Sequence, residues 1–98
     1  MKSYSDDQIL KGILRHDNLV LSYIYEQYYY KVNAFVRKNN GSSADVKDVF
    51  QEAIIIIYRK LKENGLSIQN GAFEIYFFSV CRFLWLKGLE KKIGRAHV

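Results

Sequence analysis

Three observations on the sequence predict an all-α fold, namely a compact bundle of four helices in one domain. The 98 residues contain no proline and only six glycines, so few positions interrupt the chain. Apolar residues recur at the three- and four-residue spacing of helices through each long segment between the glycines. With 49% hydrophobic and 26% charged residues, the composition is that of an ordinary globular chain. We expect one domain over residues 1–98, with helices at about 6–15, 18–39, 43–64 and 72–92.

The first helix is expected to begin with a capping box. Ser5 is followed three residues later by Gln8, the pairing in which each side chain accepts a hydrogen bond from the backbone N–H of the other. The helix should end near His16. Its apolar face comprises Ile9, Leu10, Ile13 and Leu14.

The second helix can begin after Asp17 or Asn18, since either side chain can cap it. Five tyrosines between positions 23 and 30 are too dense for one face, so we expect most to fill the core and the others to be exposed. The helix should stop at the Asn39–Asn40–Gly41 turn. Its apolar line comprises Leu21, Ile24, Tyr25, Tyr28, Val32, Phe35 and Val36.

The third helix should begin with Ser42 and Asp45, a second capping pair. Residues 53–58 read AIIIIY, and β-branched residues favour strands. Helical spacing nevertheless continues through this segment until Asn64 and Gly65 terminate it, so we predict a helix. The positions that keep this spacing are Val46, Val49, Phe50, Ala53, Ile57 and Leu61.

The opposite face of the third helix is polar around a single isoleucine, Ile55. An exposed isoleucine alone is ordinary, but an apolar centre with a charged rim is typical of a binding patch. We therefore hold two interpretations open, a solvated face and an interface. The polar residues of this face are Asp48, Gln51, Glu52, Arg59 and Lys62.

The last helix, at 73–92, is the most apolar segment and shows two apolar faces. A helix apolar on two sides is expected to be sandwiched by other helices. The polar segment 64–70 before it is either a plain connector or a source of hydrogen bonds to a ligand. One face comprises Phe73, Phe77, Val80, Cys81 and Leu84, and the other Ile75, Phe78, Leu86 and Leu89, with Arg82 among them. A third, narrower stripe is expected to face solvent or a ligand and comprises Tyr76, Ser79, Phe83, Lys87 and Glu90.

Charge and residue types limit the functions to consider. The net charge is +5, and from Arg82 onward there are five basic residues and one acid, which suits a polyanion or a solubilising terminus. The single cysteine, Cys81, has no partner within the chain and should be a buried thiol. Neither a signal peptide nor a membrane-spanning run is evident, so we expect a cytoplasmic protein. No phosphate-binding, metal-binding or catalytic pattern stands out, so we expect neither a cofactor nor an enzyme.

Three segments together resemble region two of the extracytoplasmic-function class of bacterial RNA polymerase sigma factors. The first has Ile24, Tyr25 and Glu26 followed by further tyrosines. The second, residues 41–52, reads GSSADVKDVFQE, and the third, residues 73–82, reads FEIYFFSVCR. The similarity covers about residues 5–92 and implies a compact helical bundle of the region-two type.

The resemblance implies a transcription initiation factor that is not an enzyme, with two binding surfaces. The third helix would bind the coiled coil of the polymerase β′ subunit through Asp48, Gln51, Glu52, Ile55 and Arg59. The last helix and the loop before it would recognise the promoter −10 element and hold its non-template strand. The residues implied are Asn64, Ser67, Gln69, Asn70, Tyr76, Ser79, Phe83, Lys87, Lys91 and Lys92. An anti-sigma factor is a further implied partner.

The chain departs from the family pattern on the stripe expected to face DNA. The family usually has asparagine at the position of Phe83, a polar residue at Lys87 and a basic residue at Glu90. The second, helix-turn-helix domain of complete family members is not in this sequence, which suggests a piece of a longer protein or a shortened relative. The alternative function is a helical protein-interaction module that binds polymerase or an anti-sigma factor without reading DNA.

Overall fold

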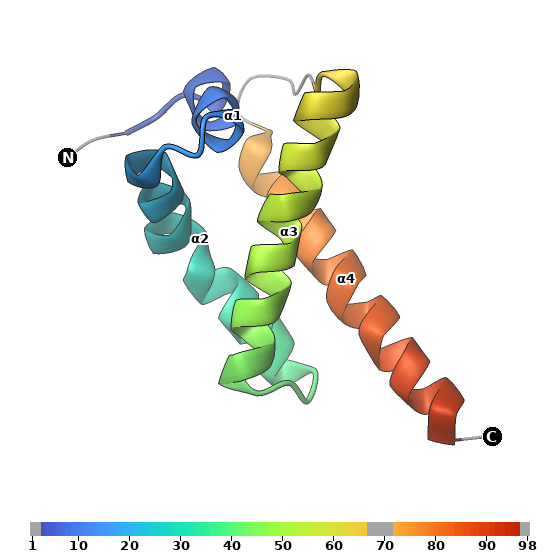
Figure 1. Ribbon diagram of the computed structural model, residues 1–98. Coiled ribbons are helices and arrows are strands. Elements are labelled where there is room, and N and C mark those ends of the chain that lie inside the picture. Colours follow the sequence, from blue (N-terminus) through green and yellow to red (C-terminus); the bar gives the residue numbers. More distant parts are fainter. Residues whose placement is uncertain (1–2, 67–71, 97–98) are drawn as a thin grey trace.

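The computed structural model describes residues 3–66 and 72–96, and the side chains among them except Asn64 and those from Glu90 onward. These residues form four helices and no strand, so the fold is all-α (Figure 1). The helices are α1 (Asp6–Leu14), α2 (Asn18–Lys38), α3 (Ser43–Asn64) and α4 (Phe73–Ala96).

Helices α2 and α3 each contact all three other helices of the described structure, and α4 packs against both. Helix α1 is short and lies at one end of the bundle, near the start of α4 (Figure 1). The C-terminal part of α4 extends past the other helices, as Figure 1 shows. The radius of gyration, 14.3 Å, exceeds the roughly 13 Å typical of a compact domain of this length, in agreement with this extension.

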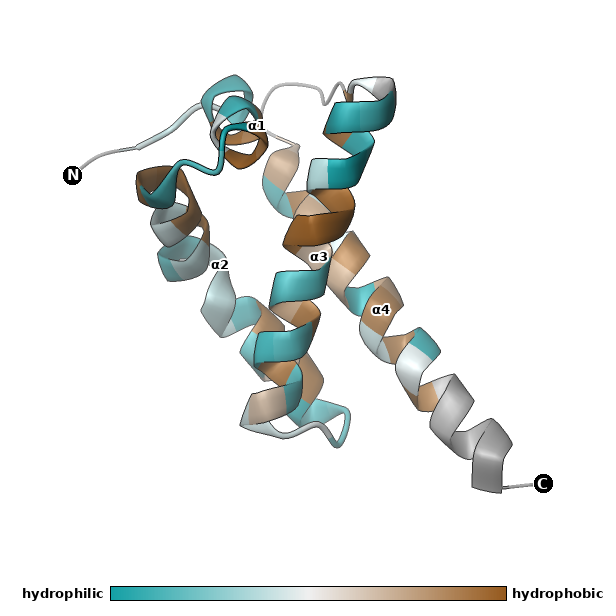
Figure 2. Cartoon of the chain, viewed as in Figure 1, coloured by the Kyte–Doolittle hydropathy of each residue, from teal (hydrophilic) through white to brown (hydrophobic). Residues whose placement is uncertain are grey.

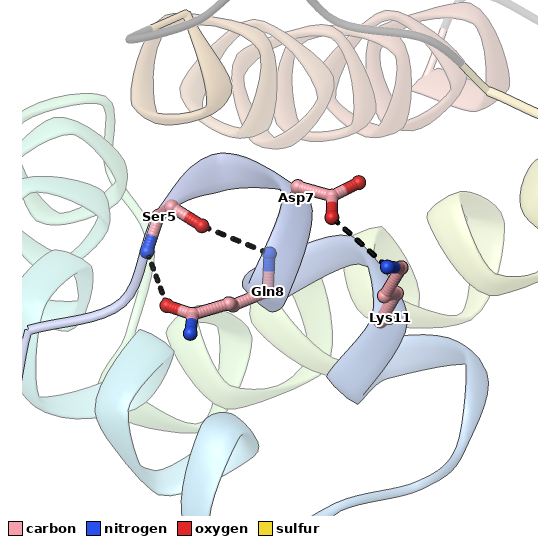
Figure 3. A network of polar contacts seen from close by, with 4 residues as sticks. All are labelled: Ser5, Asp7, Gln8 and Lys11. Carbon is pink, nitrogen blue, oxygen red and sulfur yellow. Dashed lines mark hydrogen bonds and ion pairs between the residues drawn. The ribbon is translucent and has the colours of Figure 1, made fainter.

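Both capping boxes are present where the sequence places them. At α1, the Gln8 backbone N–H donates to Ser5 Oγ at 3.2 Å and the Ser5 N–H donates to Gln8 Oε1 at 2.9 Å (Figure 3). At α3, the Asp45 N–H donates to Ser42 Oγ at 3.2 Å and the Ser42 N–H to Asp45 Oδ2 at 2.8 Å. Two backbone donors are thereby satisfied at each helix start, which fixes where these helices begin.

The remaining helix ends also follow local side-chain chemistry. Asp17, and not Asn18, caps α2, because its Oδ1 accepts from the Leu19 N–H at 2.9 Å. Helix α2 ends at Lys38 with Asn39 as its C-cap residue, and Asn40 then adopts a positive φ of 71°. Gly65 ends α3 with a φ of 64°, a conformation that glycine adopts without strain. The run of isoleucines at 54–57 lies inside α3, so the helix prediction there is confirmed.

A single core joins the four helices, and its aromatic centre lies between α2, α3 and α4. The Phe50 and Phe77 rings meet edge to face at 4.9 Å, and the Tyr28 ring lies 6.0 Å from both Phe73 and Phe77. Figure 2 shows hydrophobic residues on all four helices, among them a band across the middle of α3. The buried apolar residues are Ile9, Leu10, Ile13, Val20, Ile24, Val32, Val36, Val46, Val49, Phe50, Ala53, Ile57, Phe73, Phe77, Cys81 and Trp85.

Helix α4 departs from its predicted packing. Its buried line is Phe73, Phe77, Cys81 and Trp85, one residue every four, whereas Val80 and Leu84 are only half-buried. The predicted sandwich is wrong, because Ile75 is 71% exposed and Leu86 is 42% exposed. Helices α2 and α3 cover one side of α4, and the opposite side faces solvent.

Polar contacts hold α4 against the other helices. The Phe73 N–H donates to Asp6 Oδ2 at 3.2 Å, so a side chain of α1 caps the first turn of α4. Lys31 of α2 forms a half-exposed ion pair with Glu74, and this contact raises the pKa of Lys31. These contacts orient the helix, while exposed ion pairs add little stability.

Candidate functional site

The first candidate surface lies on the outer side of α3, and we call it the α3 surface. It comprises Asp48, Gln51, Glu52, Ile55 and Arg59, all of them exposed. Ile55 is 47% exposed and lies directly opposite the buried line of the helix. The five residues predicted to bind polymerase therefore form one accessible strip on one helix.

An apolar groove between α2 and α3 adjoins this strip. Its volume is about 350 Å³, and Gln51 and Ile55 belong to both the groove and the α3 surface. Ile55 is therefore not an isolated exposed side chain but one edge of an apolar concavity. The groove is lined by Leu21, Tyr25, Phe50, Gln51, Ile54 and Ile55.

Aromatic packing fixes the wall of the groove. The Tyr25 ring stacks on Tyr29 at 4.5 Å and meets Phe50 edge to face at 5.4 Å. Phe50 is buried and continues inward to Phe77 of the core. The groove wall is thus packed against the core through ring contacts, an arrangement that favours binding of an apolar side chain with little reorganisation.

The second candidate surface is the side of α4 turned away from the core, and we call it the α4 outward face. Its centre is apolar, with Ile75 71%, Phe83 60% and Leu86 42% exposed. At 100° per residue, Arg82 and Lys87 lie about 140° apart and border this centre on its two sides. The face comprises Ile75, Ser79, Arg82, Phe83, Leu86 and Lys87, and each is exposed.

Both cations of this face lie near aromatic rings. The Lys87 ammonium is 5.5 Å from the centre of the Phe83 ring, and the Arg82 guanidinium is 5.9 Å from the centre of the Phe35 ring. The first contact places a positive charge beside the most exposed aromatic ring of α4. A polyanion with flat bases would find both charge and an aromatic surface there.

Tyr76 departs from the predicted solvent-facing stripe. Its side chain is half-buried, and its hydroxyl is buried without a hydrogen-bond partner among the described residues. The Lys60 ammonium of α3 lies 5.8 Å from its ring. Tyr76 therefore packs at the edge between α4 and α3, and its hydroxyl is not offered on the α4 outward face.

Ser79 lies at the centre of the exposed side, but its hydroxyl is already engaged. Its Oγ donates to the backbone carbonyl oxygen of Ile75 at 2.9 Å. Serine hydroxyls inside helices commonly donate to the carbonyl oxygen four residues earlier in this way. Ser79 thus adds little hydrogen-bond donor capacity to the face.

Several predicted DNA-binding residues lie outside what the structure describes. Ser67, Gln69 and Asn70 belong to the segment that it leaves out, and the side chains of Asn64, Lys91 and Lys92 are likewise outside the described residues, as is that of Glu90. The α4 backbone itself continues as a helix to Ala96. Of the predicted DNA-binding residues, Ser79, Phe83 and Lys87 are those placed on the α4 outward face.

Sequence reasoning missed the groove residues Leu21, Tyr25 and Ile54 as a site. Their signal was present in part, because Leu21 and Tyr25 lie four residues apart and therefore on the same side of α2. The pattern placed them in the core line, whereas Tyr25 is 44% exposed in the structure. The concavity arises from how α2 and α3 approach each other.

Among the described residues, no group of three or more His, Cys, Asp or Glu side chains is placed to hold a metal ion. None of the helices in that part of the chain is long and apolar enough to cross a membrane. No protein-family model, curated protein or solved structure matches the chain.

Proposed function

We propose that this chain is a transcription initiation module of the sigma region-two type. It binds the β′ coiled coil of RNA polymerase through the α3 surface and holds the non-template strand of the promoter −10 element on α4. The observation that carries the proposal is the continuity of the α3 surface with the apolar groove through Gln51 and Ile55. The all-α fold and the sequence resemblance support it.

The α3 surface has the anatomy of an interface for a helical partner. Ile55 and the groove form an apolar centre, and the exposed Asp48 and Glu52 carboxylates border it. The apolar residues of a coiled coil lie mainly in the seam between its helices, and its outer surface is rich in charged residues. Basic residues of such a partner can meet the carboxylates, while an apolar side chain exposed on the partner can enter the groove. Binding energy in such interfaces concentrates on a few buried anchors.

The α4 outward face supports the nucleic-acid part of the proposal. Phe83 offers an exposed ring, and Arg82 and Lys87 offer positive charge on either side of it. An unpaired base can stack on an aromatic side chain for about 1–3 kcal/mol. Phosphate contacts by lysine and arginine supply the remaining affinity.

A second function, a protein-interaction module without DNA-reading activity, has one observation in its favour. Ile75 is 71% and Leu86 is 42% exposed, so the α4 outward face is more apolar than a nucleic-acid surface requires. In this function a protein partner, such as an anti-sigma factor, covers that face. Polymerase binding through the α3 surface is common to both functions.

The test is binding of the chain to an isolated β′ coiled-coil fragment by titration calorimetry. Ile55→Glu should weaken binding at least about tenfold, because a charge at the apolar centre is desolvated without a partner. The double variant Asp48→Ala with Gln51→Ala should weaken it in the same direction. Ile75→Glu is the matched control, since it makes the same change on α4 and should leave the affinity unchanged.

Circular dichroism should show an unaltered helix content for each variant, because all the changed side chains are exposed. Wild-type affinity in Ile55→Glu would remove the α3 surface from the interface. Equal weakening by Ile55→Glu and Ile75→Glu would show that the change of charge, and not its position, is responsible.

A further inference from the structure

A second concavity lies between α1 and the first turn of α2, and we call it the α1–α2 pocket. It shares no lining residue with the α2–α3 groove. Its volume is about 200 Å³. Sites for drug-sized ligands measure roughly 300–1,000 Å³, so this pocket has room for a small molecule or a single side chain only.

The floor and one wall of the pocket are apolar. Gly12 of α1 and Val20 of α2 line it and are buried. A Cβ atom at Gly12 would lie 2.4 Å from Val20 Cγ2, so the two helices meet closely beneath the pocket. The wall is the Tyr4 ring, which meets the Tyr23 ring edge to face at 5.0 Å. A ligand therefore needs a short apolar part to fill this space.

The polar side chains of the pocket supply mainly hydrogen-bond donors. The exposed Arg15 guanidinium has no ion pair or hydrogen bond within the part of the chain that the structure describes. Lys11 pairs with Asp7 at 3.1 Å, and its ammonium retains further donors. Gln8 accepts from the Ser5 N–H through Oε1, so its amide nitrogen, turned away from Ser5 in Figure 3, keeps two donors. Such a set favours an anion.

Asp17 limits which anion fits. It lines the pocket, and its Oδ1 accepts from the Leu19 N–H at 2.9 Å. This fixed negative charge repels a phosphate group, which carries up to two charges, more strongly than it repels a carboxylate. Arginine also matches a carboxylate through two parallel hydrogen bonds.

We propose that the α1–α2 pocket binds a carboxylate carried on a short apolar stem. Arg15 pairs with the carboxylate, and the stem lies against Tyr4 and Val20. A free short-chain carboxylic acid offers this group, and so does a glutamate side chain of a protein partner. The site goes beyond the proposed function, because it shares no residue with the α3 surface or the α4 outward face.

The experiment follows backbone amide shifts of the ¹⁵N-labelled chain by NMR during titration at constant pH and ionic strength. The probes are butyrate, acetate, butyramide and inorganic phosphate. Butyrate should bind saturably, with the largest shifts at the residues of the α1–α2 pocket. Acetate should bind about fourfold or more weakly, because each buried methylene contributes roughly that factor. Butyramide lacks the charge, and it and phosphate should bind more weakly than butyrate.

Three variants test the roles of the charged residues. Arg15→Gln should weaken butyrate binding at least about fivefold, because it removes the charge-assisted pair. Arg37→Gln is the matched control, since it makes the same change at an exposed position of α2 outside the pocket and should leave the affinity unchanged. Asp17→Asn keeps a side chain that caps α2 and should strengthen phosphate binding by removing the repulsion.

A blocked Ala-Glu-Ala tripeptide and its Ala-Gln-Ala counterpart distinguish the two sources of the carboxylate. Selective binding of the glutamate peptide at the pocket assigns it to an acidic side chain of a partner, and binding of butyrate alone assigns it to a free small acid. Equal affinity of Arg15→Gln and the wild type for butyrate would overturn the proposal. So would equal binding of butyramide, tighter binding of phosphate than of butyrate, or shifts that do not saturate.

Discussion

The Trp85 indole Nε1 donates a hydrogen bond to the backbone carbonyl oxygen of Asn39 at 3.2 Å and so ties the middle of α4 to the C-terminus of α2. The same ring borders Gly41, where a Cβ atom would lie 2.9 Å from Trp85 Cζ2. A large buried side chain therefore packs against a turn that has no room for another. This contact positions the half of α4 that carries Phe83 and Lys87.

We expect Trp85→Phe to destabilise the fold by about 1–3 kcal/mol, because the Asn39 carbonyl loses its donor and the smaller ring fills less volume. The measurement is the free energy of unfolding from urea titration. Tyr30→Phe, a conservative change at an exposed position, should alter it by less than about 0.5 kcal/mol. Equal stability of Trp85→Phe and the wild type would mean that the hydrogen bond contributes nothing.

The two glycines Gly12 and Gly88 should respond in opposite directions to alanine. A Cβ at Gly12 would lie 2.4 Å from Val20 Cγ2, so α1 would have to move away from α2, at about 1–3 kcal/mol. At Gly88 a Cβ meets nothing within 4 Å, so Gly88→Ala should stabilise α4 by about 0.5–1 kcal/mol. Thermal unfolding of both variants checks this.

A rescue experiment assigns the Gly12 effect to its contact. The double variant Gly12→Ala with Val20→Gly should lose less stability than the two single changes added together, because glycine at position 20 lacks the Cβ, Cγ1 and Cγ2 atoms that the new methyl group would meet. Strict additivity would place the cause elsewhere. A destabilised Gly88→Ala would contradict the open space seen beside that position.

The chain should lose stability at alkaline pH, and at a lower pH than a helical protein without such buried groups. Burial raises the pKa of Cys81 to about 12, and burial, followed by the nearby Tyr23, Glu74 and Asp6, raises that of Tyr28 to about 12. In the unfolded chain these groups ionise near 8.5 and 10. Their protonated forms therefore favour folding fully below about pH 8.5, and this stability is lost as the pH rises toward 12.

The urea midpoint should fall between pH 8 and pH 11, and Cys81→Ala should show a shallower fall because one titrating group is removed. Thiol reagents offer a second measurement at pH 8. Cys81 is 1% exposed, so it should react only in denaturant. A fast reaction of the native chain would contradict its burial.

Tyr25→Ala should weaken binding to the β′ coiled-coil fragment, because it removes one wall of the α2–α3 groove. The expected loss is about tenfold, the size typical of an aromatic contact at an interface centre. Tyr30→Ala removes a tyrosine that does not line the groove and should bind normally. Identical affinities of Tyr25→Ala and Tyr30→Ala would show that the groove does not take part.

The sequence was sufficient for the helices because their signals are local. The Ser5–Gln8 and Ser42–Asp45 pairs each satisfy backbone donors within one turn, so they specify helix starts without any tertiary contact. The same holds for Gly65, whose φ of 64° ends α3. The isoleucines at 54–57 favour a strand by propensity, but the helical spacing around them extends over several turns and outweighs that preference.

The packing of α4 could not be predicted in this way. Its sequence is apolar almost all round, so periodicity alone does not say which side α2 and α3 cover. The pattern assigned Val80 and Leu84 to the buried face, whereas Trp85 holds that place and bonds to Asn39. For the site, exposure of Ile55 and Phe83 followed from helical geometry, but the groove and the buried Tyr76 hydroxyl depend on the distance between helices.

The cap that Asp6 provides to Phe73 has a consequence for synthesis on the ribosome. Asp6 is synthesised early, whereas Phe73, whose backbone N–H donates to its carboxylate, is translated 67 residues later. We therefore expect a nascent chain that stops before α4 to remain only loosely ordered. Helices α1 and α4 should then pack together in a single step after α4 has been synthesised. Pulse proteolysis of stalled chains of increasing length would reveal a sudden gain in resistance once α4 has left the exit tunnel.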